Sequence, residues 1–127
     1  MADLLEQGAQ FLDEKRHAHM TRTVVYTRGA ASVEVAATIG QTIFEQEYEF
    51  GGIQRIQSRD FLLRTADLVL DSEQVLPQAG DTIRETVGEK VFVYEVMAPG
   101  SEPPFRYSDP YRKALRIHTK HVATEDA

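Results

Sequence analysis

The stretch IRETVGEKVFVYEVM, residues 83–97, indicates the fold more clearly than any other part of the sequence. β-Branched and aromatic residues lie on both sides of Gly88-Glu89, and a two-residue turn that begins with glycine is typical of a type II′ β-hairpin. After the turn, apolar residues from Val91 to Val96 occupy both faces, so we expect this strand to be the most buried one. The stretch predicts an antiparallel β-sheet.

A first hairpin is expected upstream of this stretch. The segment TVVYT at 23–27 is rich in β-branched residues, the residues RGA at 28–30 are typical of a turn, and apolar residues alternate from 32 to 39. Gly40 is then expected to interrupt the strand.

A second hairpin is expected to join residues 41–50 to residues 53–63. A three-residue loop at 51–53 sets Glu49 opposite Arg55 and Glu45 opposite Arg59, whereas a loop with an even number of residues separates these charges. Opposite charges across a strand pair are worth about 0.2–1 kcal/mol, which favours the three-residue loop with a glycine bulge. The other face of this hairpin would carry Phe44, Tyr48 and Ile56.

Turn residues and alternation predict the remaining elements. Residues 61–70 are expected to form a strand as far as Arg64, followed by an irregular or short 3₁₀ segment. Residues 75–83 form a turn in which Gly80 has a positive φ and Asp81 bonds nearby backbone amides. Four of the five prolines lie between residues 99 and 110, so this segment is expected to be a long structured loop. A last strand is expected at 113–122, with Leu115, Ile117 and Thr119 on one face.

Length and composition place these elements in one soluble domain. The chain has 127 residues, no cysteine and a formal net charge of −6, which argues against a disulfide framework, a thiolate site and free nucleic acid as a partner. Membrane-spanning and signal-peptide patterns are also lacking, so no membrane partner is expected. The predicted fold class is mainly β (α+β): a small antiparallel β-barrel or sandwich at 20–122, an N-terminal α-helix at 1–19, a long projecting loop or hairpin, and a flexible tail at 123–127.

No catalytic residue, cofactor or metal site is predicted. The histidines occur as His17 and His19, which would share a face in an extended segment, and as His118 and His121, which would point to opposite faces of a strand. No cysteine or acidic residue stands beside either pair, as a metal site would require. Acid–base chemistry at His118 would need a carboxylate nearby, such as that of Asp109 or Glu95.

Charged residues are separated along the chain. The segment from Gly29 to Gln54 has four acidic residues and no basic one, a net charge of −4, and the segment from Phe105 to His121 has five basic residues and one acidic, a net charge of +4. Either the two segments are neighbours in one sheet and neutralise each other, or the subunit has an acidic and a basic side, as subunits of a head-to-tail ring do. Aromatic residues, which often carry binding energy at interfaces, lie in the same segments.

Four different segments in the second half of the chain together make up a pattern of short motifs: VLPQAGDTI at 75–83, Tyr94-Glu95-Val96, Asp109-Pro110-Tyr111-Arg112, and LRIHT at 115–119. The pattern resembles that of the small head-tail joining proteins, also called neck or stopper proteins, of tailed bacteriophages and prophages. Those proteins have a Pro-x-x-Gly-Asp-x-apolar turn, a Tyr-x-Val strand and a closing Leu-x-apolar strand.

The resemblance implies a β-barrel subunit with an added helix and a projecting loop. It implies a ring of six copies that joins the portal or adaptor ring of a DNA-filled capsid to the tail, assembled in the host cytoplasm and then held at the head–tail junction of the virion. Whether the isolated subunit is a monomer stays open. The residues expected at contacts between subunits or with portal and tail proteins are Phe44, Glu45, Glu47, Tyr48, Glu49, Phe50, Arg55, Arg59, Phe105, Tyr107, Tyr111, Arg112 and Arg116. Arg112, Arg116 and Lys120 are the candidates for contact with DNA in the channel.

Two other functions stay open at this stage. One is a tail-terminator or tail-completion subunit, whose fold would be more helical with a mixed sheet. The other is a small β-barrel enzyme, or a metal- or ligand-binding domain, that uses the histidines.

Overall fold

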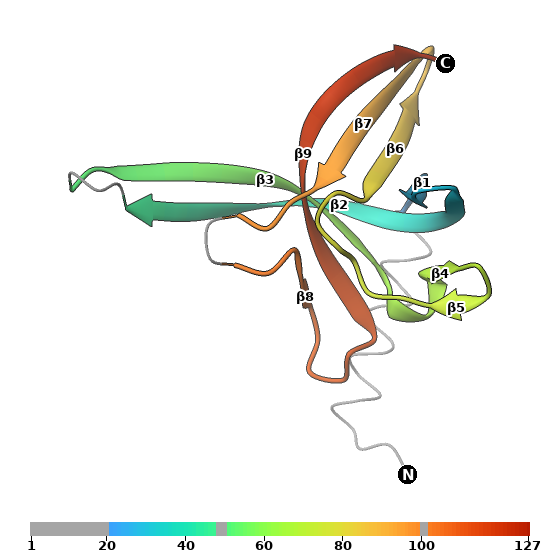
Figure 1. Cartoon of the computed structure of the whole chain (residues 1–127), viewed down its shortest axis with the longest axis horizontal. Helices are drawn as coiled ribbons and strands as arrows, with labels where there is room; N and C mark the ends of the chain where they lie inside the picture. Colours follow the sequence, from blue (N-terminus) through green and yellow to red (C-terminus); the bar gives the residue numbers. More distant parts are fainter. Residues whose placement is uncertain (1–20, 48–50, 100–101) are drawn as a thin grey trace.

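The computed structural model describes residues 21–47, 51–99 and 102–127 (Figure 1). The helix predicted at 1–19 lies outside the described residues. The described residues contain no α-helix. Their one helical element is a short 3₁₀ turn, so no described helix is long and apolar enough to cross a membrane.

Nine strands and one 3₁₀ turn make up the described chain. In order they are β1 (Arg22–Arg28), β2 (Ala31–Glu47), β3 (Ile53–Arg64), the 3₁₀ turn η1 (Thr65–Asp67), β4 (Val69–Leu70), β5 (Glu73–Gln74), β6 (Thr82–Val87), β7 (Lys90–Val96), β8 (Phe105–Tyr107) and β9 (Ala114–Asp126).

Seven of these strands form one antiparallel sheet with the order β3-β2-β1-β6-β7-β9-β8, and a further pairing joins β3 to β9. The strands cross near the centre of the molecule and then diverge (Figure 1). The β2–β3 hairpin projects to one side, and β6, β7 and the second half of β9 project in another direction, which we call the upper arm. The prediction of a mainly β fold is confirmed, but the sheet does not form a clear barrel or sandwich.

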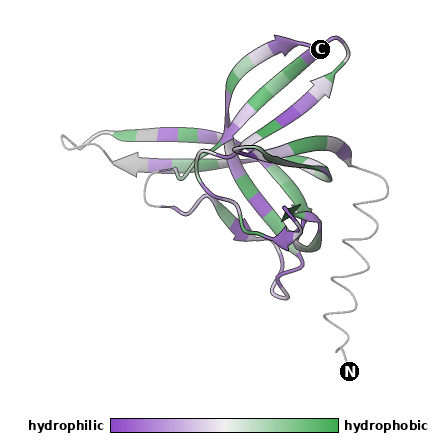
Figure 2. Ribbon diagram, turned by 45° about the vertical axis from the view of Figure 1, so that its right-hand side comes forward, coloured by the Kyte–Doolittle hydropathy of each residue, from purple (hydrophilic) through white to green (hydrophobic). Residues whose placement is uncertain are grey.

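The core lies where the strands cross. Apolar and polar residues alternate along the strands (Figure 2), as expected when one face of a sheet is buried. The largest fully buried apolar side chains come from six segments of the chain: Val24, Tyr26, Phe61, Leu63, Leu68, Ile83, Val96, Leu115 and Ile117. Because β2, β3 and β9 all run through this core and beyond it, whatever lies at their ends is held by the same packing.

Local sequence rules predicted several elements correctly. Of the two residues in the β6–β7 turn only Gly88 has a positive φ, +61°, which fits the predicted type II′ turn. The strand that ends at Arg64 is followed by the expected 3₁₀ turn. Gly80 has a φ of +96°, and the Asp81 carboxylate accepts a hydrogen bond from the backbone N–H of Gln78 at 3.0 Å.

The prediction of a break at Gly40 is wrong, because β2 continues through it as one strand of 17 residues. A Cβ at this position would lie 3.2 Å from Leu62 Cδ1 and 3.4 Å from Arg116 Nη2. The glycine therefore allows neighbouring side chains to approach the strand instead of ending it.

The predicted register of the β2–β3 hairpin is also wrong in its partners. Glu45 stands opposite Arg55, and the last described pair is Glu47 with Ile53, so the connection is longer than the three-residue loop that we expected. Its parity is odd, as predicted, and for that reason the acidic strand still faces the basic one. Phe44 and Ile56 share the other face, as predicted, and in the structure they stand directly opposite each other.

Two further expectations fail, one that the chain frays after residue 122 and one that residues 91–96 form the most buried strand. Residues 123–126 are not a frayed tail, because β9 extends to Asp126, which pairs with Lys90. Cross-strand pairing with β7 and the ion pairs of Glu125 with Arg84 and of Asp126 with Lys90 hold this segment, and short-range composition does not reveal them. The first half of β9, from Ala114 to Thr119, is more uniformly buried than β7, which is buried mainly in its second half.

Candidate functional site

The projecting β2–β3 hairpin has two different faces. Ile43 and Ile53 lie on the same face as Glu45 and Arg55, and the two isoleucine side chains are 59% and 64% exposed. Glu45 and Arg55 form a loose ion pair, 3.6 Å between Arg55 Nε and Glu45 Oε1. This face is continuous with the core-facing side of the sheet, because the same alternation runs from Ile43 back to Ile39 and Phe61.

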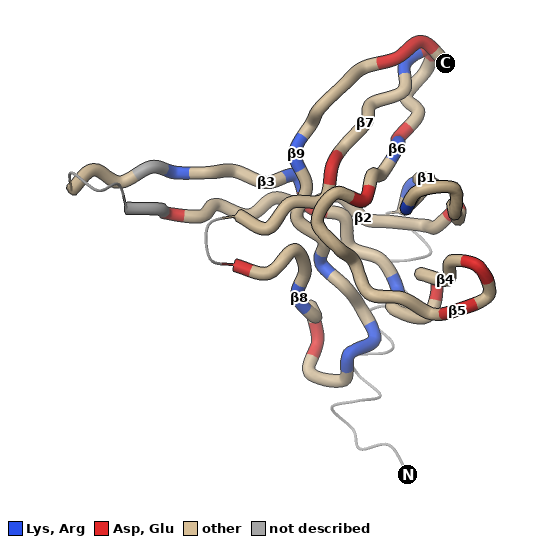
Figure 3. The backbone as a smooth tube through the Cα atoms, in the orientation of Figure 1, with Lys and Arg blue, Asp and Glu red and all other residues tan. Residues whose placement is uncertain are grey.

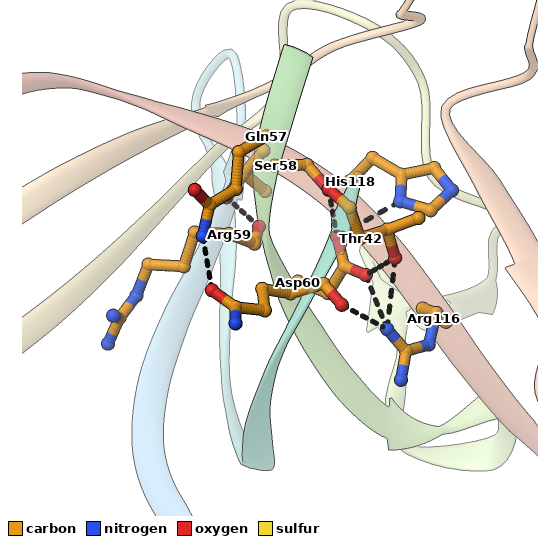
Figure 4. Close-up of polar contacts among 9 residues, drawn as sticks. Thr42, Gln57, Ser58, Arg59, Asp60, Arg116 and His118 are labelled. Carbon is orange, nitrogen blue, oxygen red and sulfur yellow. Dashed lines mark hydrogen bonds and ion pairs between the residues drawn. The ribbon is translucent and has the colours of Figure 1, made fainter. Parts of the chain in front are cut away.

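The root of the hairpin contains a buried polar cluster, which we call the Asp60 cluster (Figure 4). The Asp60 carboxylate is fully buried and accepts hydrogen bonds from Arg116 Nη1 at 2.6 Å, from the hydroxyls of Ser58 and Thr42, and contacts His118 Nδ1 at 3.0 Å. The contributing residues come from β2, β3 and β9. The cluster therefore connects the three strands at the point where the hairpin leaves the sheet.

The contacts of Asp60 determine its ionisation. Burial by itself raises the pKa of a carboxyl group, but hydrogen bonds from His118, Ser58, Thr42 and Arg116 outweigh this effect and lower the pKa of Asp60 well below its usual value. Asp60 is therefore a carboxylate at neutral pH, paired with a guanidinium. The ring of Phe44 packs edge-on against His118, with centroids 4.9 Å apart.

Ser58, Asp60 and His118 are residue types that also occur in nucleophilic catalysis, but their arrangement differs from a catalytic one. Ser58 donates to the Asp60 carboxylate and not to the imidazole, and the lowered pKa of Asp60 makes this carboxylate a weak base for activating the hydroxyl. All three side chains are buried. The arrangement suits a structural role, in which the cluster links β2, β3 and β9. Among the described residues, no three side chains of His, Asp and Glu come together as metal ligands would.

A cleft of about 730 Å³ opens between the hairpin and the upper arm, and we call it the root cleft. Its lining comes from β2, β3, β7 and β9 and includes Ile39, Gln41, Arg59, Tyr94, Lys120 and His121. None of the described residues that line it is acidic. The guanidinium of Arg59 lies 4.9 Å from the centre of the Tyr94 ring, and its Nη2 is 2.8 Å from Glu85 Oε1.

The charge around Arg59 is not fully balanced by Glu85. The Glu85 carboxylate, which is almost fully buried, is shared with Arg22, whose Nη1 lies 3.3 Å from Oε2. The buried Nε of Arg59 has no hydrogen-bond partner within the described structure. With Lys120 at the rim, the cleft has a cationic character that an anionic group would complement.

The described part of the proline-rich segment, residues 102–110, forms a second region with defined contacts. It runs alongside β9, where the backbone N–H of His118 donates to the carbonyl of Pro104 at 2.9 Å. After β8, the Asp109 carboxylate accepts hydrogen bonds from three backbone amides of the β8–β9 loop, at 2.9–3.1 Å. The Arg112 guanidinium lies 5.5 Å from the centre of the Tyr107 ring. These contacts give the loop one defined shape.

The structure separates the residues that we predicted for the interface. Phe44, Arg59 and Arg116 lie near the root of the hairpin, Glu45 and Arg55 lie along it, and Phe105, Tyr107 and Arg112 lie together around β8. The backbone of Glu47 ends β2, and Tyr48, Glu49 and Phe50 are outside the described residues. Tyr111 is half-buried in the β8–β9 loop.

Figure 3 shows where the charges lie. Basic residues follow β9 and the β8–β9 loop, whereas acidic residues gather at the β4–β5 turn and at the tip of the upper arm. Glu45 pairs with Arg55 on its own hairpin, and Arg116 pairs with Asp60. Glu45, from the acidic segment 29–54, therefore pairs with a residue outside the basic segment 105–121. Arg116, from the basic segment, likewise pairs with a residue outside the acidic one.

Sequence reasoning missed Asp60, Ser58 and Thr42 as partners of Arg116 and His118. The carboxylate near His118 is that of Asp60, and not that of Asp109 or Glu95. The one sequence signal was an aspartate directly before the apolar run FLL at 61–63, because a carboxylate in a buried strand requires partners. Those partners depend on the β3–β9 register, which is a long-range feature.

Comparison with known families agrees with this geometry. The chain matches the family model described as phage head-tail joining protein over residues 2–126, and no curated protein matches it. The chain therefore belongs to the phage head-tail joining protein family. The resemblance found between residues 75 and 122 extends to nearly the whole chain, and it assigns the protein a structural role among the head and tail proteins of a phage particle.

Proposed function

We propose that this protein is a ring-forming connector of the stopper type, six copies of which join the portal or adaptor ring of a phage or prophage head to the tail. The observation that carries the proposal is the family match over residues 2–126. The projecting hairpin supports it, because a ring subunit needs a surface that reaches beyond its own core, and the exposed isoleucines on this hairpin have no covering partner among the described residues.

The described fold also favours a connector over the tail-terminator alternative. A terminator was expected to be more helical, whereas residues 21–47, 51–99 and 102–127 contain strands and a single 3₁₀ turn. Buried packing of Ser58, Asp60 and His118 likewise favours a structural role over an enzymatic one.

In vitro joining tests the proposal. A phage that lacks this gene should accumulate DNA-filled heads and free tails, and the purified protein should join them. Joined particles are counted by electron microscopy, and infectious units are counted by plating. The control is the same preparation with the protein heat-denatured. Heads that join to tails without the protein, or tails that terminate incorrectly in its absence, would overturn the proposal.

A further inference from the structure

We propose that the root cleft of one copy receives the β2–β3 hairpin of a second copy, with Glu45 of the incoming hairpin against Arg59 and Lys120 of the receiving copy. The inference rests on the proposed ring-forming function and specifies its contact. It concerns two surfaces at opposite ends of the same pair of strands, one at the root and one toward the tip.

The first argument is the exposed apolar face of the hairpin. Ile43 and Ile53 are among the most exposed large apolar side chains of the described structure, and they share a face with Glu45. Within the sheet this same face is the core, where Ile39 stands opposite Phe61. Beyond Gly40 no described residue covers it. Two exposed isoleucines among charged and polar side chains, on a strand face that is left open, are typical of an interface.

The second argument is charge complementarity. The cleft is lined by Arg59, Lys120 and His121 and by no acidic residue among those described. Glu45 is 61% exposed and is held only by a loose contact with Arg55 at 3.6 Å, so it can turn toward another cation. Glu125 and Asp126 at the tip of the upper arm are less available, since Arg84 and Lys90 already hold them at 2.7 and 2.6 Å.

The third argument is chemical fit within the cleft. The Tyr94 ring and Ile39 supply apolar walls against which an isoleucine can pack. The Arg59 side chain is 33% exposed, so part of it is open to the cleft, and a carboxylate is the acceptor that best matches a guanidinium. An occupant with one apolar side chain and one carboxylate two residues apart therefore suits the site. Ile43 and Glu45 have this spacing and lie on one face of β2.

The fourth argument is geometry. With a rise of about 3.3 Å per residue, β2 extends about 23 Å from Gly40 to Glu47, far enough to reach a neighbouring molecule. A hairpin cannot insert into the cleft at its own root, so the occupant must come from another copy. Because the two surfaces differ, the contact is head-to-tail, which closes into a ring when the rotation between copies allows it.

Disulfide trapping tests the contact directly. The chain has no cysteine, so Glu45→Cys and Lys120→Cys each introduce a single thiol. The two purified variants, one of them carrying an affinity tag, are mixed under mild oxidation, and the mixed disulfide is measured on a non-reducing gel. We expect at least fivefold more mixed disulfide than for Glu45→Cys with Glu73→Cys, an exposed control position on β5. The same pairs are tested in particles joined in vitro.

Charge reversal provides an independent measurement. Glu45→Lys and Lys120→Glu should each weaken self-association about tenfold or more, and the double variant should recover part of it, because positions 45 and 120 are again opposite in charge while Arg59 is unchanged. Glu73→Lys is the matched control and should leave association unchanged. Association is measured by sedimentation velocity, and folding is verified by circular dichroism, since all three positions are exposed.

The outcomes separate this inference from the proposed function. If particles join but Glu45→Cys and Lys120→Cys do not cross-link above the control in solution or in particles, the docking is wrong and the connector function stands. If the protein neither cross-links nor joins heads to tails, both are wrong. Self-association that is unchanged in Lys120→Glu, or that is not even partly recovered in the double variant, also overturns the docking.

Discussion

Replacing Asp60 by asparagine should destabilise the protein strongly. Asp60 is fully buried, and its carboxylate forms hydrogen bonds with Arg116, His118, Ser58 and Thr42 at the same time. Removing one partner from a buried ion pair costs about 3–5 kcal/mol, because the other charge remains unpaired.

The expected loss is somewhat smaller here, about 2–4 kcal/mol. The Arg116 side chain retains 21% exposure, so water can solvate part of the unpaired charge, and asparagine can still accept hydrogen bonds from the hydroxyls. For a domain of this size that loss corresponds to a fall in Tm of about 6–15 °C. Urea unfolding followed by circular dichroism measures the free energy, and calorimetry measures the Tm.

Glu45→Gln is the matched control for this prediction. It also removes one carboxylate from an arginine pair, but that pair is exposed and 3.6 Å apart, so the change should stay below about 0.5 kcal/mol. A second variant, Asp60→Asn with Arg116→Met, removes the orphaned charge and should recover about 1 kcal/mol or more. If Asp60→Asn lowers the free energy of unfolding by less than about 1 kcal/mol, or if the double variant recovers none of it, the Asp60 cluster does not hold β2, β3 and β9 together as we describe.

The same carboxylate gives the stability a pH dependence of known sign. Because the pKa of Asp60 is lower in the folded protein than in the unfolded chain, its ionisation stabilises the fold above about pH 4 and this contribution is lost as the pH falls further. The wild-type protein should therefore lose unfolding free energy in acid, and Asp60→Asn should lose less over the same range. Parallel acid slopes for the two proteins would contradict this assignment.

Three further changes test other parts of the structure. Burial and the hydrogen bond to Asp81 raise the pKa of Tyr26, so an absorbance titration should show this tyrosine ionising later than an exposed one, with stability falling as the pH rises above about 10. Tyr26→Phe should remove one tyrosine from the delayed phase and leave Tyr94, whose pKa is also raised by burial. Gly40→Ala should cost about 1–2 kcal/mol in urea unfolding, because the added methyl group meets Leu62 Cδ1 at 3.2 Å. Asp109→Ala should leave the Tm nearly unchanged yet increase amide exchange in the β8–β9 loop, since three backbone amides lose their acceptor.

Features set by neighbouring residues could be predicted from the sequence. The Gly88 turn, the end of β3 at Arg64 and the Asp81 turn each depend on a few adjacent residues with strong conformational preferences. Gly40 shows the limit of such rules. In the sequence a glycine between two alternating segments is typical of a break, and only the approach of Leu62 and Arg116 explains why the strand continues through it.

Features set by long-range pairing could not be predicted. The charge pattern correctly indicated which faces of β2 and β3 meet, but the ion pair with Arg55 forms at Glu45, since cross-strand charges at the surface are too weak to determine a register. The partner of His118 depends on the alignment of β9 with β3, 58 residues apart in the chain. Residues 123–127 were expected to fray as the last few residues of a domain usually do, although β9 is held as far as Asp126 by pairing with β7.

The position of the Asp60 cluster bears on how a joining protein directs its hairpin. A buried ion pair adds little net stability compared with apolar packing of the same volume, so stability alone does not account for charges at this site. Apolar contacts tolerate sliding and rotation, whereas a carboxylate with four directional partners is satisfied in a narrow range of geometries. Since these partners lie on β2, β3 and β9, a change in the angle of the hairpin would leave a buried charge unpaired. The direction of the hairpin is therefore determined where it leaves the sheet, and the apolar face that it carries is presented at a fixed angle to whatever it binds.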